Sequence, residues 1–273
     1  MLKKRIIFTL LYDNGSFMLS RNFRLQKVGT IDWLQKNYDF SHIAFYIDEL
    51  IVLDVSRGER DIEHFSDALK ILAKGCFAPI AAGGGVRKLS DARRLLRSGA
   101  DKIVINSVLF NDPEFVTTLA QEFGQQCVVG SIDIKKELDG SYHVYSDNGS
   151  CQRNESVTKL LEQFAVKSVG EFYLNSINQD GTGQGYDMSL LDLIPHQLNL
   201  PTILAGGAGH SQHFINGLLD KRVDAVATAH LFNFVGDGLK KARESIRLQD
   251  FDLANWPLLS ELKSDLSMKG IVI

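Results

Sequence analysis

Short apolar runs alternate with amphipathic segments along most of this chain. The first run, Arg5-Ile-Ile-Phe-Thr-Leu-Leu-Tyr, begins close to the N-terminus. Later runs begin near Glu49, Pro79, Ile103, Cys127, Glu171, Thr202 and Asp224. Short apolar runs bounded by turn residues are typical of the buried strands of a parallel sheet.

The segments between these runs have the spacing of helices. Residues 61–73 place Ile62, Phe65, Leu69 and Leu72 on one face, and the next segment does the same with Ala92, Leu95, Leu96 and Gly99. Further helices are expected over 31–38, 157–164 and 237–247, and Asp112-Pro113 begins another because proline suits the first turn of a helix. Strand, turn, helix and strand in this order form βαβ units.

One of these units occurs twice. Pro79-Ile-Ala-Ala-Gly-Gly-Gly recurs as Pro201-Thr-Ile-Leu-Ala-Gly-Gly, and an offset of 122 residues (201 − 79, or 232 − 110) also relates Phe110 to Phe232. A repeat that holds several βα units indicates two half-barrels. The sequence therefore predicts an α/β fold, a single (βα)8 TIM barrel domain over residues 1–273 with a helical C-terminal extension.

Two longer connections interrupt this pattern. Residues 13–30, which carry Arg21, Arg24 and Lys27, are expected to form a long loop. This loop is either a functional lid or a flexible insertion without a function. Residues 135–153 are polar, and their Asp139-Gly140 and Asn148-Gly149 pairs predict a small hairpin.

Composition excludes several classes of protein. The chain has 273 residues, of which 44% are hydrophobic and 23% charged, so it can bury a large core. A net charge of −3 argues against a general nucleic-acid or membrane surface. Three distant cysteines (Cys76, Cys127 and Cys151) indicate a reducing compartment rather than disulfides or a zinc site. Without a signal peptide or a long apolar run, the protein is expected to be cytoplasmic and to need no metal or cofactor.

The glycine turns are candidate anion sites. Gly84-Gly85 and Gly206-Gly207 each follow a strand, and Asp180-Gly181-Thr182 follows another. Glycines there let backbone N–H groups approach an oxyanion, although tight βα turns need glycine without any ligand too. Barrel active sites lie at the carboxyl ends of the strands, so two facing turns would suit a phosphorylated small molecule with phosphate at both ends.

Several stretches resemble the HisF family, the cyclase subunit of imidazole glycerol phosphate synthase, over Leu2 to about Arg243. The matching stretches are Lys4-Arg-Ile-Ile, Ile47-Asp-Glu-Leu, Gly99-Ala-Asp-Lys, Ser131-Ile-Asp, Asn178-Gln-Asp-Gly-Thr and Ala205-Gly-Gly-Ala-Gly. The resemblance implies a HisH-like glutamine amidotransferase partner at the barrel bottom, whose ammonia passes through the core. It also implies a lyase activity that cyclises a ribulosyl intermediate bearing two phosphates, in histidine biosynthesis.

The resemblance also implies roles for individual residues. One phosphate site would comprise Gly84, Gly85, Asn106 and Ser107, and the other Asp180, Gly181, Thr182, Gly206, Gly207, Ala229 and His230. Arg5, Glu49, Lys102 and Glu171 match the family's ammonia gate, and because each opens a predicted strand they could form a closed ring of ion pairs. Asp101 matches a position at which the amidotransferase docks.

Departures from the family are equally informative. The family uses two aspartates, at the ends of the first and fifth barrel strands, as general acid and base. Asp133 matches the second of these, but Leu11 occupies the first position and Asp13 lies two residues further on. A lysine of the family's first loop is replaced by Leu19.

These losses resemble a divergent branch of the family found with surface-polysaccharide genes. There, with an amidotransferase and a sugar amidase-like partner, such proteins serve acetamidino modification of a sugar. We favour that interpretation over a true histidine-pathway cyclase or a non-catalytic ammonia-channelling scaffold. Asp54, at the end of the second barrel strand, is a candidate polar contact for substrate, and His210 and His213 suit a surface or capping role better than a metal site.

Overall fold

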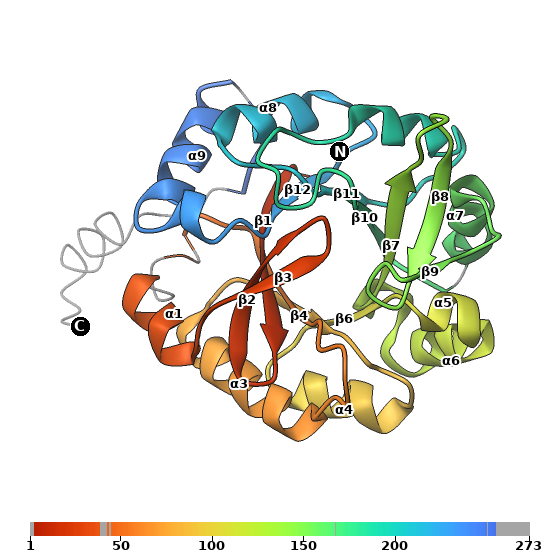
Figure 1. Ribbon diagram of the computed structural model, residues 1–273, viewed down its shortest axis with the longest axis horizontal. Coiled ribbons are helices and arrows are strands. Elements are labelled where there is room, and N and C mark those ends of the chain that lie inside the picture. Colours follow the sequence, from red (N-terminus) through yellow and green to blue (C-terminus); the bar gives the residue numbers. More distant parts are fainter. Residues whose placement is uncertain (1–2, 39–42, 44, 167, 250, 255–273) are drawn as a thin grey trace, which may run out of the picture.

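A closed barrel of parallel strands organises the molecule (Figure 1). The computed structural model describes residues 3–38, 43, 45–166, 168–249 and 251–254. Within them the barrel strands are β1 (Arg5–Asp13), β4 (Glu49–Asp54), β5 (Ile80–Gly83), β6 (Lys102–Ile105), β7 (Val128–Lys136), β10 (Glu171–Ser176), β11 (Thr202–Ala205) and β12 (Ala225–Thr228). Each pairs in parallel with its neighbours, and the β10–β7 and β1–β12 ladders complete the circle. The predicted (βα)8 TIM barrel is confirmed.

Helices surround this barrel. They are α1 (Ile31–Asn37), α3 (Ile62–Gly75), α4 (Leu89–Arg97), α5 (Val108–Asn111), α6 (Pro113–Phe123), α7 (Val157–Ala165), α8 (Ser211–Leu219) and α9 (Gly238–Arg247), with short 3₁₀ turns over Gln125–Cys127, Met188–Leu193 and Phe232–Phe234. Asp61 and Asp112 accept hydrogen bonds from the first turns of α3 and α6, which fixes where these helices begin. The predicted C-terminal extension beyond residue 254 lies outside the described residues.

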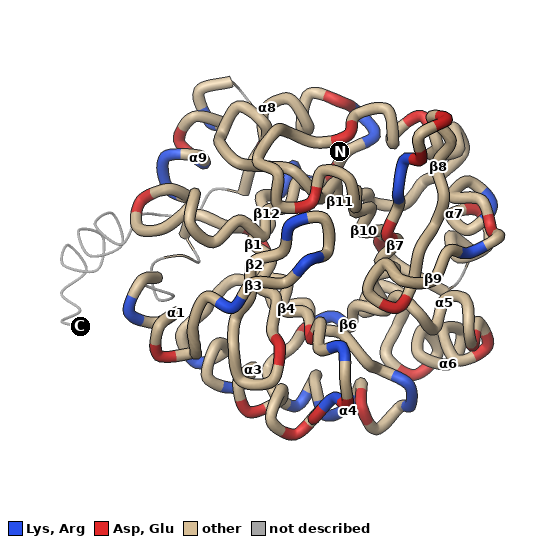
Figure 2. Tube along the Cα trace, viewed as in Figure 1, with Lys and Arg blue, Asp and Glu red and all other residues tan. Residues whose placement is uncertain are grey.

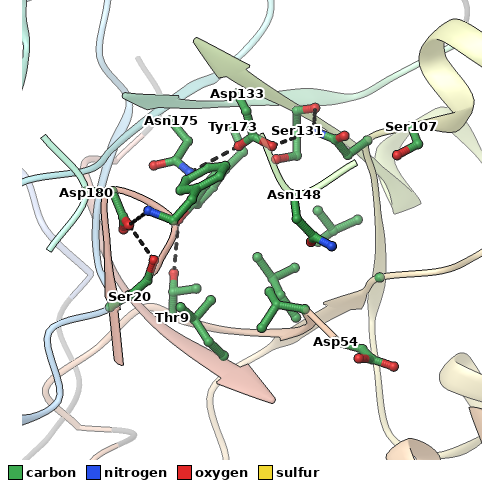
Figure 3. A pocket seen from close by; sticks show the side chains of 18 of the residues that line it. Thr9, Ser20, Asp54, Ser107, Ser131, Asp133, Asn148, Tyr173, Asn175 and Asp180 are labelled. Atoms are coloured by element: carbon green, nitrogen blue, oxygen red, sulfur yellow. Dashed lines mark hydrogen bonds between the residues drawn. The ribbon is translucent and has the colours of Figure 1, made fainter. Parts of the chain in front are cut away.

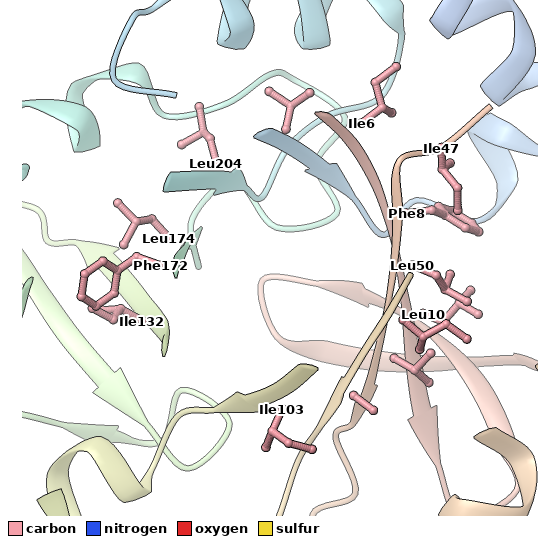
Figure 4. Close-up of a cluster of buried hydrophobic side chains, with 14 of the residues drawn as sticks. Ile6, Phe8, Leu10, Ile47, Leu50, Ile103, Ile132, Phe172, Leu174 and Leu204 are labelled. Carbon is pink, nitrogen blue, oxygen red and sulfur yellow. The ribbon is translucent and has the colours of Figure 1, made fainter. Parts of the chain in front are cut away.

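Strand alternation divides the core into two layers. Ile6, Phe8 and Leu10 of β1 point outward and pack beneath the helices, together with Leu50 of β4 (Figure 4). The residues between them point inward, and a smaller cluster that includes Ile7, Ile51, Ala81, Val129, Tyr173, Ala225 and Ala227 fills the barrel. The barrel interior is therefore narrow, apolar and rich in alanine.

Aspartates join adjacent strands at the bottom of the barrel. Asp48 accepts the N–H of Ile6 at 2.7 Å, and Asp101 accepts that of Ile80 at 2.8 Å. Asp224 does the same for Thr202 at 3.0 Å. Each aspartate precedes one strand and binds the first residues of its neighbour, so Asp101 has a structural bond in addition to its expected docking role.

The segment expected to be a long loop is a β-hairpin, and that expectation is wrong. Its strands are β2 (Ser16–Arg21) and β3 (Arg24–Gly29), and β2 pairs antiparallel with the end of β1. Asn14-Gly15 makes the first turn, with φ of 43° and 84°, and Asn22-Phe23 makes the second, with φ of 49° and 63°. An Asn-Gly pair is a strong signal for a hairpin, but the polar residues farther along the segment favoured a loop.

The second long connection is the hairpin that the sequence predicts. β8 (Tyr142–Ser146) pairs with the end of β7, and β9 (Cys151–Gln152) pairs with β8. Both hairpins rise from the carboxyl end of the barrel and flank its mouth (Figure 1). Among the helices that the structure describes, none combines the length and apolar character that a bilayer crossing requires.

Candidate active site

A cavity of about 400 Å³ lies at the carboxyl ends of the strands. Most of the predicted site residues line it: Gly84, Gly85, Asn106, Ser107, Asp133, Asp180, Gly181, Gly206, Gly207, Ala229 and His230. Thr182 is outside this lining, and its hydroxyl donates instead to the carbonyl of Gln179 at 2.8 Å. The structure thus brings both glycine turns and the β7 carboxylate into one space.

Asp133 is the most perturbed acid in this cavity. The side-chain amides of Asn106 and Asn175 donate to its two oxygens at 3.0 and 3.1 Å (Figure 3). Burial raises the pKa of Asp133 to about 7, helped by the charge of Asp180, while the two amides act in the opposite direction. A carboxyl group with a pKa near neutrality can both donate and accept a proton.

The raised pKa of Asp133 makes stability depend on pH. Because the folded state holds this proton more tightly than the unfolded chain, the free energy of unfolding should fall as pH rises from about 4 to about 7. We expect Asp133→Asn to flatten the curve by roughly 2–4 kcal/mol between pH 5 and pH 8. Urea denaturation of the wild type and the variant at these pH values gives the free energy of unfolding. The altered hydrogen bonds lower that free energy equally at every pH, so they do not change its dependence on pH.

Leu11 lies on the opposite wall, at the position where the family resemblance implies a carboxylate. Leu11 lines the cavity and pairs in register with Leu53, which lines it as well. Asp13 and Leu19 do not belong to the lining, and Leu19 pairs with Gln26 within the hairpin. Neither residue supplies the missing group.

Asp54 is the carboxylate that lies across the cavity from Asp133 (Figure 3). It accepts the N–H of Ser56 at 2.9 Å, and Arg60 lies 3.8 Å away. Burial raises the pKa of Asp54, while Ser56 and Arg60 oppose this effect. These contacts hold its carboxylate at the rim, beside the first glycine turn.

The β2–β3 hairpin is fastened over the cavity by Asp180. The carboxylate of Asp180 accepts the Ser20 hydroxyl, and it accepts the backbone N–H of Phe23 at 3.0 Å. The Asn22 N–H binds the Asp180 carbonyl at 2.9 Å, and Arg57 donates to the Phe23 carbonyl from the other side. Asp180 therefore uses its carboxylate to hold the hairpin rather than to face an anion, which it would repel.

Gly181 is required where the hairpin touches the barrel. Its φ is +66°, and a Cβ there would lie 1.8 Å from the carbonyl oxygen of Ser20. We expect Gly181→Ala to displace the hairpin, so that amide hydrogen exchange over residues 16–29 accelerates about 10-fold or more. Gly140→Ala is the matched control, because Gly140 has φ of +86° but nothing lies within 4 Å of where its added methyl group would stand. Equal protection of the hairpin in both variants would contradict the contact.

The two glycine turns differ in their surroundings. At the first, the Asn106 amide is bound to Asp133 and the Ser107 hydroxyl donates to Asp147 at 3.0 Å, which leaves the backbone of Gly84 and Gly85 as the main neutral donors. At the second, Nδ1 of His230 accepts the N–H of Asn233 at 3.4 Å, so Nε2 is the protonated nitrogen of the neutral ring. Burial lowers the pKa of His230, which keeps the ring in that form.

Sequence reasoning missed the arginines of the cavity. Arg57, Arg60 and Arg87 all line it, and the stem of Arg60 lies against Gly85 of the first glycine turn. It also missed Asn175, which orients Asp133, and Phe23, which the hairpin places at the mouth. One feature of the sequence could have indicated Arg57 and Arg60: they follow Asp54, the end of a barrel strand, within six residues.

A closed ring of ion pairs lies at the other end of the barrel. Arg5 contacts Glu49 at 2.9 Å and also Glu171, while Lys102 contacts Glu49 at 2.9 Å and Glu171 at 3.1 Å. The glutamate side chains are 2% and 7% exposed, whereas both cations are 23% exposed toward the bottom. Each of the four residues begins its strand, as the sequence placed it.

Comparisons with known proteins agree with this architecture. The model of a family described as histidine biosynthesis protein matches residues 38–236. A protein of Parasynechococcus marenigrum (strain WH8102), provisionally named imidazole glycerol phosphate synthase subunit hisF2, is 48% identical over 95% of this chain and 97% of its own length. Proteins named imidazole glycerol phosphate synthase subunit HisF from Hydrogenobaculum sp. (strain Y04AAS1) and Streptococcus sanguinis (strain SK36) are 34% and 33% identical, each over 86% of this chain and 92% of their own length.

Proposed function

This chain belongs to the HisF family of imidazole glycerol phosphate synthase subunits, and from that premise we propose a specialised role for it. It accepts ammonia from a HisH-like glutamine amidotransferase at the barrel bottom and delivers it to a substrate held between two anion sites at the top. In this way it serves the amidination of a surface-polysaccharide sugar, together with a sugar amidase-like partner.

The ion-pair ring and the apolar interior support ammonia transfer. Between the ring and the cavity lie small and aliphatic side chains, among them Ile7, Ala81 and Ala225, and then Thr9, whose hydroxyl lies 3.4 Å from that of Tyr173. Neutral ammonia can enter such a space, whereas ammonium would leave its hydration shell at a cost of several kcal/mol or more. The path therefore favours the form that reacts.

Leu11 is the single observation that carries the choice of substrate. It puts an apolar surface where cyclisation needs a second proton-transfer group, and Asp13 does not line the cavity. The higher identity to the hisF2-named protein than to the two HisF-named proteins is consistent with a divergent branch. A true histidine-pathway cyclase remains an alternative if Asp54 supplies the second carboxylate, and a non-catalytic scaffold if Asp133 is not used.

Docking through Asp101 tests the partner assignment. This residue is exposed at the bottom of the barrel, beside Lys102 of the ring. Asp101→Lys is expected to weaken binding of the amidotransferase at least about 10-fold, because a favourable charge becomes an opposing one. Calorimetric titration or co-purification with the amidotransferase from the same organism measures the loss.

The structural bond of Asp101 requires a matched variant. Asp101→Asn keeps an oxygen that can accept the Ile80 N–H, so it removes charge without removing that bond. It should fold as the wild type does and bind the partner with intermediate affinity. Wild-type affinity in the Lys variant would place the interface elsewhere and remove the support for a partner at this face.

A further inference from the structure

We propose that the cavity end at the Gly84–Gly85 turn binds a diphosphate group, held by Arg57, Arg60 and Arg87. The proposal rests on the proposed function, because it specifies the substrate class of the same site. All three arginines line the cavity, Arg57 and Arg60 from the loop between β4 and α3 and Arg87 from the loop between β5 and α4.

The Nε–H donor of Arg60 has no hydrogen-bond acceptor among the residues that the structure describes. Its side-chain stem lies over the glycine turn, since a Cβ on Gly85 would be 2.7 Å from Cδ of Arg60. The Nε atom of Arg60 is buried and has no hydrogen-bond acceptor, and the nearest carboxylate oxygen, on Asp54, is 3.8 Å away. A buried donor without a partner is costly unless a ligand completes it.

Arg57 and Arg87 line the cavity and can offer N–H donors to an anion. In the described part of the chain neither has a carboxylate partner, and Arg57 binds only the Phe23 carbonyl. Two acids of the same lining have other contacts: Asp112 accepts the N–H of Phe115 at 3.0 Å, and Asp147 accepts the Ser107 hydroxyl. Asp147 also pairs with Arg153 at 3.4 Å. Within the described residues, the guanidinium groups of Arg57 and Arg87 therefore line the cavity without an ion pair.

The opposite end of the cavity provides an internal comparison. The Gly206–Gly207 turn is equivalent to Gly84–Gly85 in the repeat, yet the atoms nearest to where a Cβ would stand there belong to Ser176, Asn175, Gly185 and Gln179 rather than to an arginine. Its ionisable neighbours are Asp180 and a neutral His230. Since the fold is the same at both turns, the contact with the Arg60 stem is what distinguishes the first turn from the second.

A diphosphate matches the number of donors at this end of the cavity better than a monophosphate. The backbone donors of the glycine turn and Arg60 can hold one phosphoryl group, and the forked guanidinium groups of Arg57 and Arg87 remain for a second. A diphosphate ester is also the form in which sugars are activated for transfer, which agrees with the proposed sugar substrate. The Gly206–Gly207 end would then hold a singly charged anionic part of that molecule.

Titration calorimetry of the full chain with inorganic pyrophosphate and with orthophosphate tests this assignment. We expect pyrophosphate to bind at least about 10-fold more tightly than orthophosphate. The double variant Arg57→Gln/Arg87→Gln should weaken pyrophosphate binding about 10–100-fold and change orthophosphate binding less than about 3-fold. Arg93→Gln is the control, since Arg93 is exposed on α4 and pairs with Glu122 outside the cavity.

Equal affinities for the two anions, or an unchanged pyrophosphate affinity in the double variant, would overturn the diphosphate assignment. Neither result would bear on ammonia transfer, because the partner binds at the opposite end of the barrel. Conversely, tight pyrophosphate binding by a chain that fails to bind any amidotransferase would leave this site standing and remove the proposed function.

Discussion

Purified protein supplied with ammonium salt is expected to cyclise the histidine-pathway intermediate at least about 10²-fold more slowly than a HisF barrel with both carboxylates. Cyclisation needs proton transfer on two sides of the substrate, and this cavity provides Asp133 on one side and Leu11 on the other. Ammonium salt replaces the partner and the channel, so only the top of the barrel is under test. Product formation over time gives the rate.

Two variants sharpen that experiment. Leu11→Asp should recover a small part of the activity, because the hairpin still carries Leu19 in place of a lysine. Asp54→Asn tests a carboxylate that lies across the cavity from Asp133 (Figure 3). A wild-type rate comparable with that of a true cyclase would defeat the sugar assignment, and its loss in Asp54→Asn would identify the replacement acid.

Asp133→Asn is expected to lower sugar amidination about 10²–10⁴-fold in the complete system, because the amide cannot exchange protons with the substrate. Asp133 is held by two side-chain amides and has a pKa of about 7, which places it in the range where one group serves as acid and base. The wild-type rate should therefore change with pH around neutrality. The measurement is amidinated product formed with amidotransferase, sugar substrate and this chain present.

Asp13→Asn is the control for that variant. Asp13 is a carboxylate near the end of the same barrel mouth, but it does not line the cavity and contacts the side chain of Asn14 at 3.0 Å. Its loss should leave amidination within about 2-fold of wild type. Full activity in Asp133→Asn would mean that the barrel only conducts ammonia, and the scaffold alternative would then hold.

The barrel could be predicted because its signals are local and repeated. Apolar runs, glycine turns and the 122-residue repeat each depend on residues close in sequence or at a constant offset. The positions of Arg5, Glu49, Lys102 and Glu171 at strand starts followed from the same pattern, since parallel strands bring their first residues to one end. The cavity at the carboxyl ends of the strands could be predicted for the same reason, because parallel strands also bring their last residues to one end of the barrel.

Features that depend on tertiary contact could not be predicted. Asn14-Gly15 is a local signal for the hairpin over residues 16–29, but its position over the cavity depends on Asp180, which is 160 residues distant from Ser20 along the chain. The Asp101 bond to Ile80 depends on the register of two strands. The direction of Arg57, Arg60 and Arg87 is set by irregular loops, whose side chains have no period to extrapolate.

Charge along the chain shows how these loops shape the mouth. Basic positions, Arg21 and Arg24, stand at the tip of the β2–β3 hairpin, which extends over the open end of the barrel (Figure 2). The cavity lining holds charges of both signs, with Arg57, Arg60 and Arg87 beside Asp54, Asp112, Asp133, Asp147 and Asp180.

Isotope transfer tests the central claim, that ammonia passes from a partner amidotransferase through this barrel, most directly. The reconstituted system is supplied with glutamine carrying nitrogen-15 in its amide and with an excess of unlabelled ammonium, and the amidinated product is analysed by mass spectrometry. We predict that the new nitrogen is nitrogen-15, because the ion-pair ring and apolar interior separate the path from bulk solvent. A product whose nitrogen matches the bulk ammonium would contradict the account.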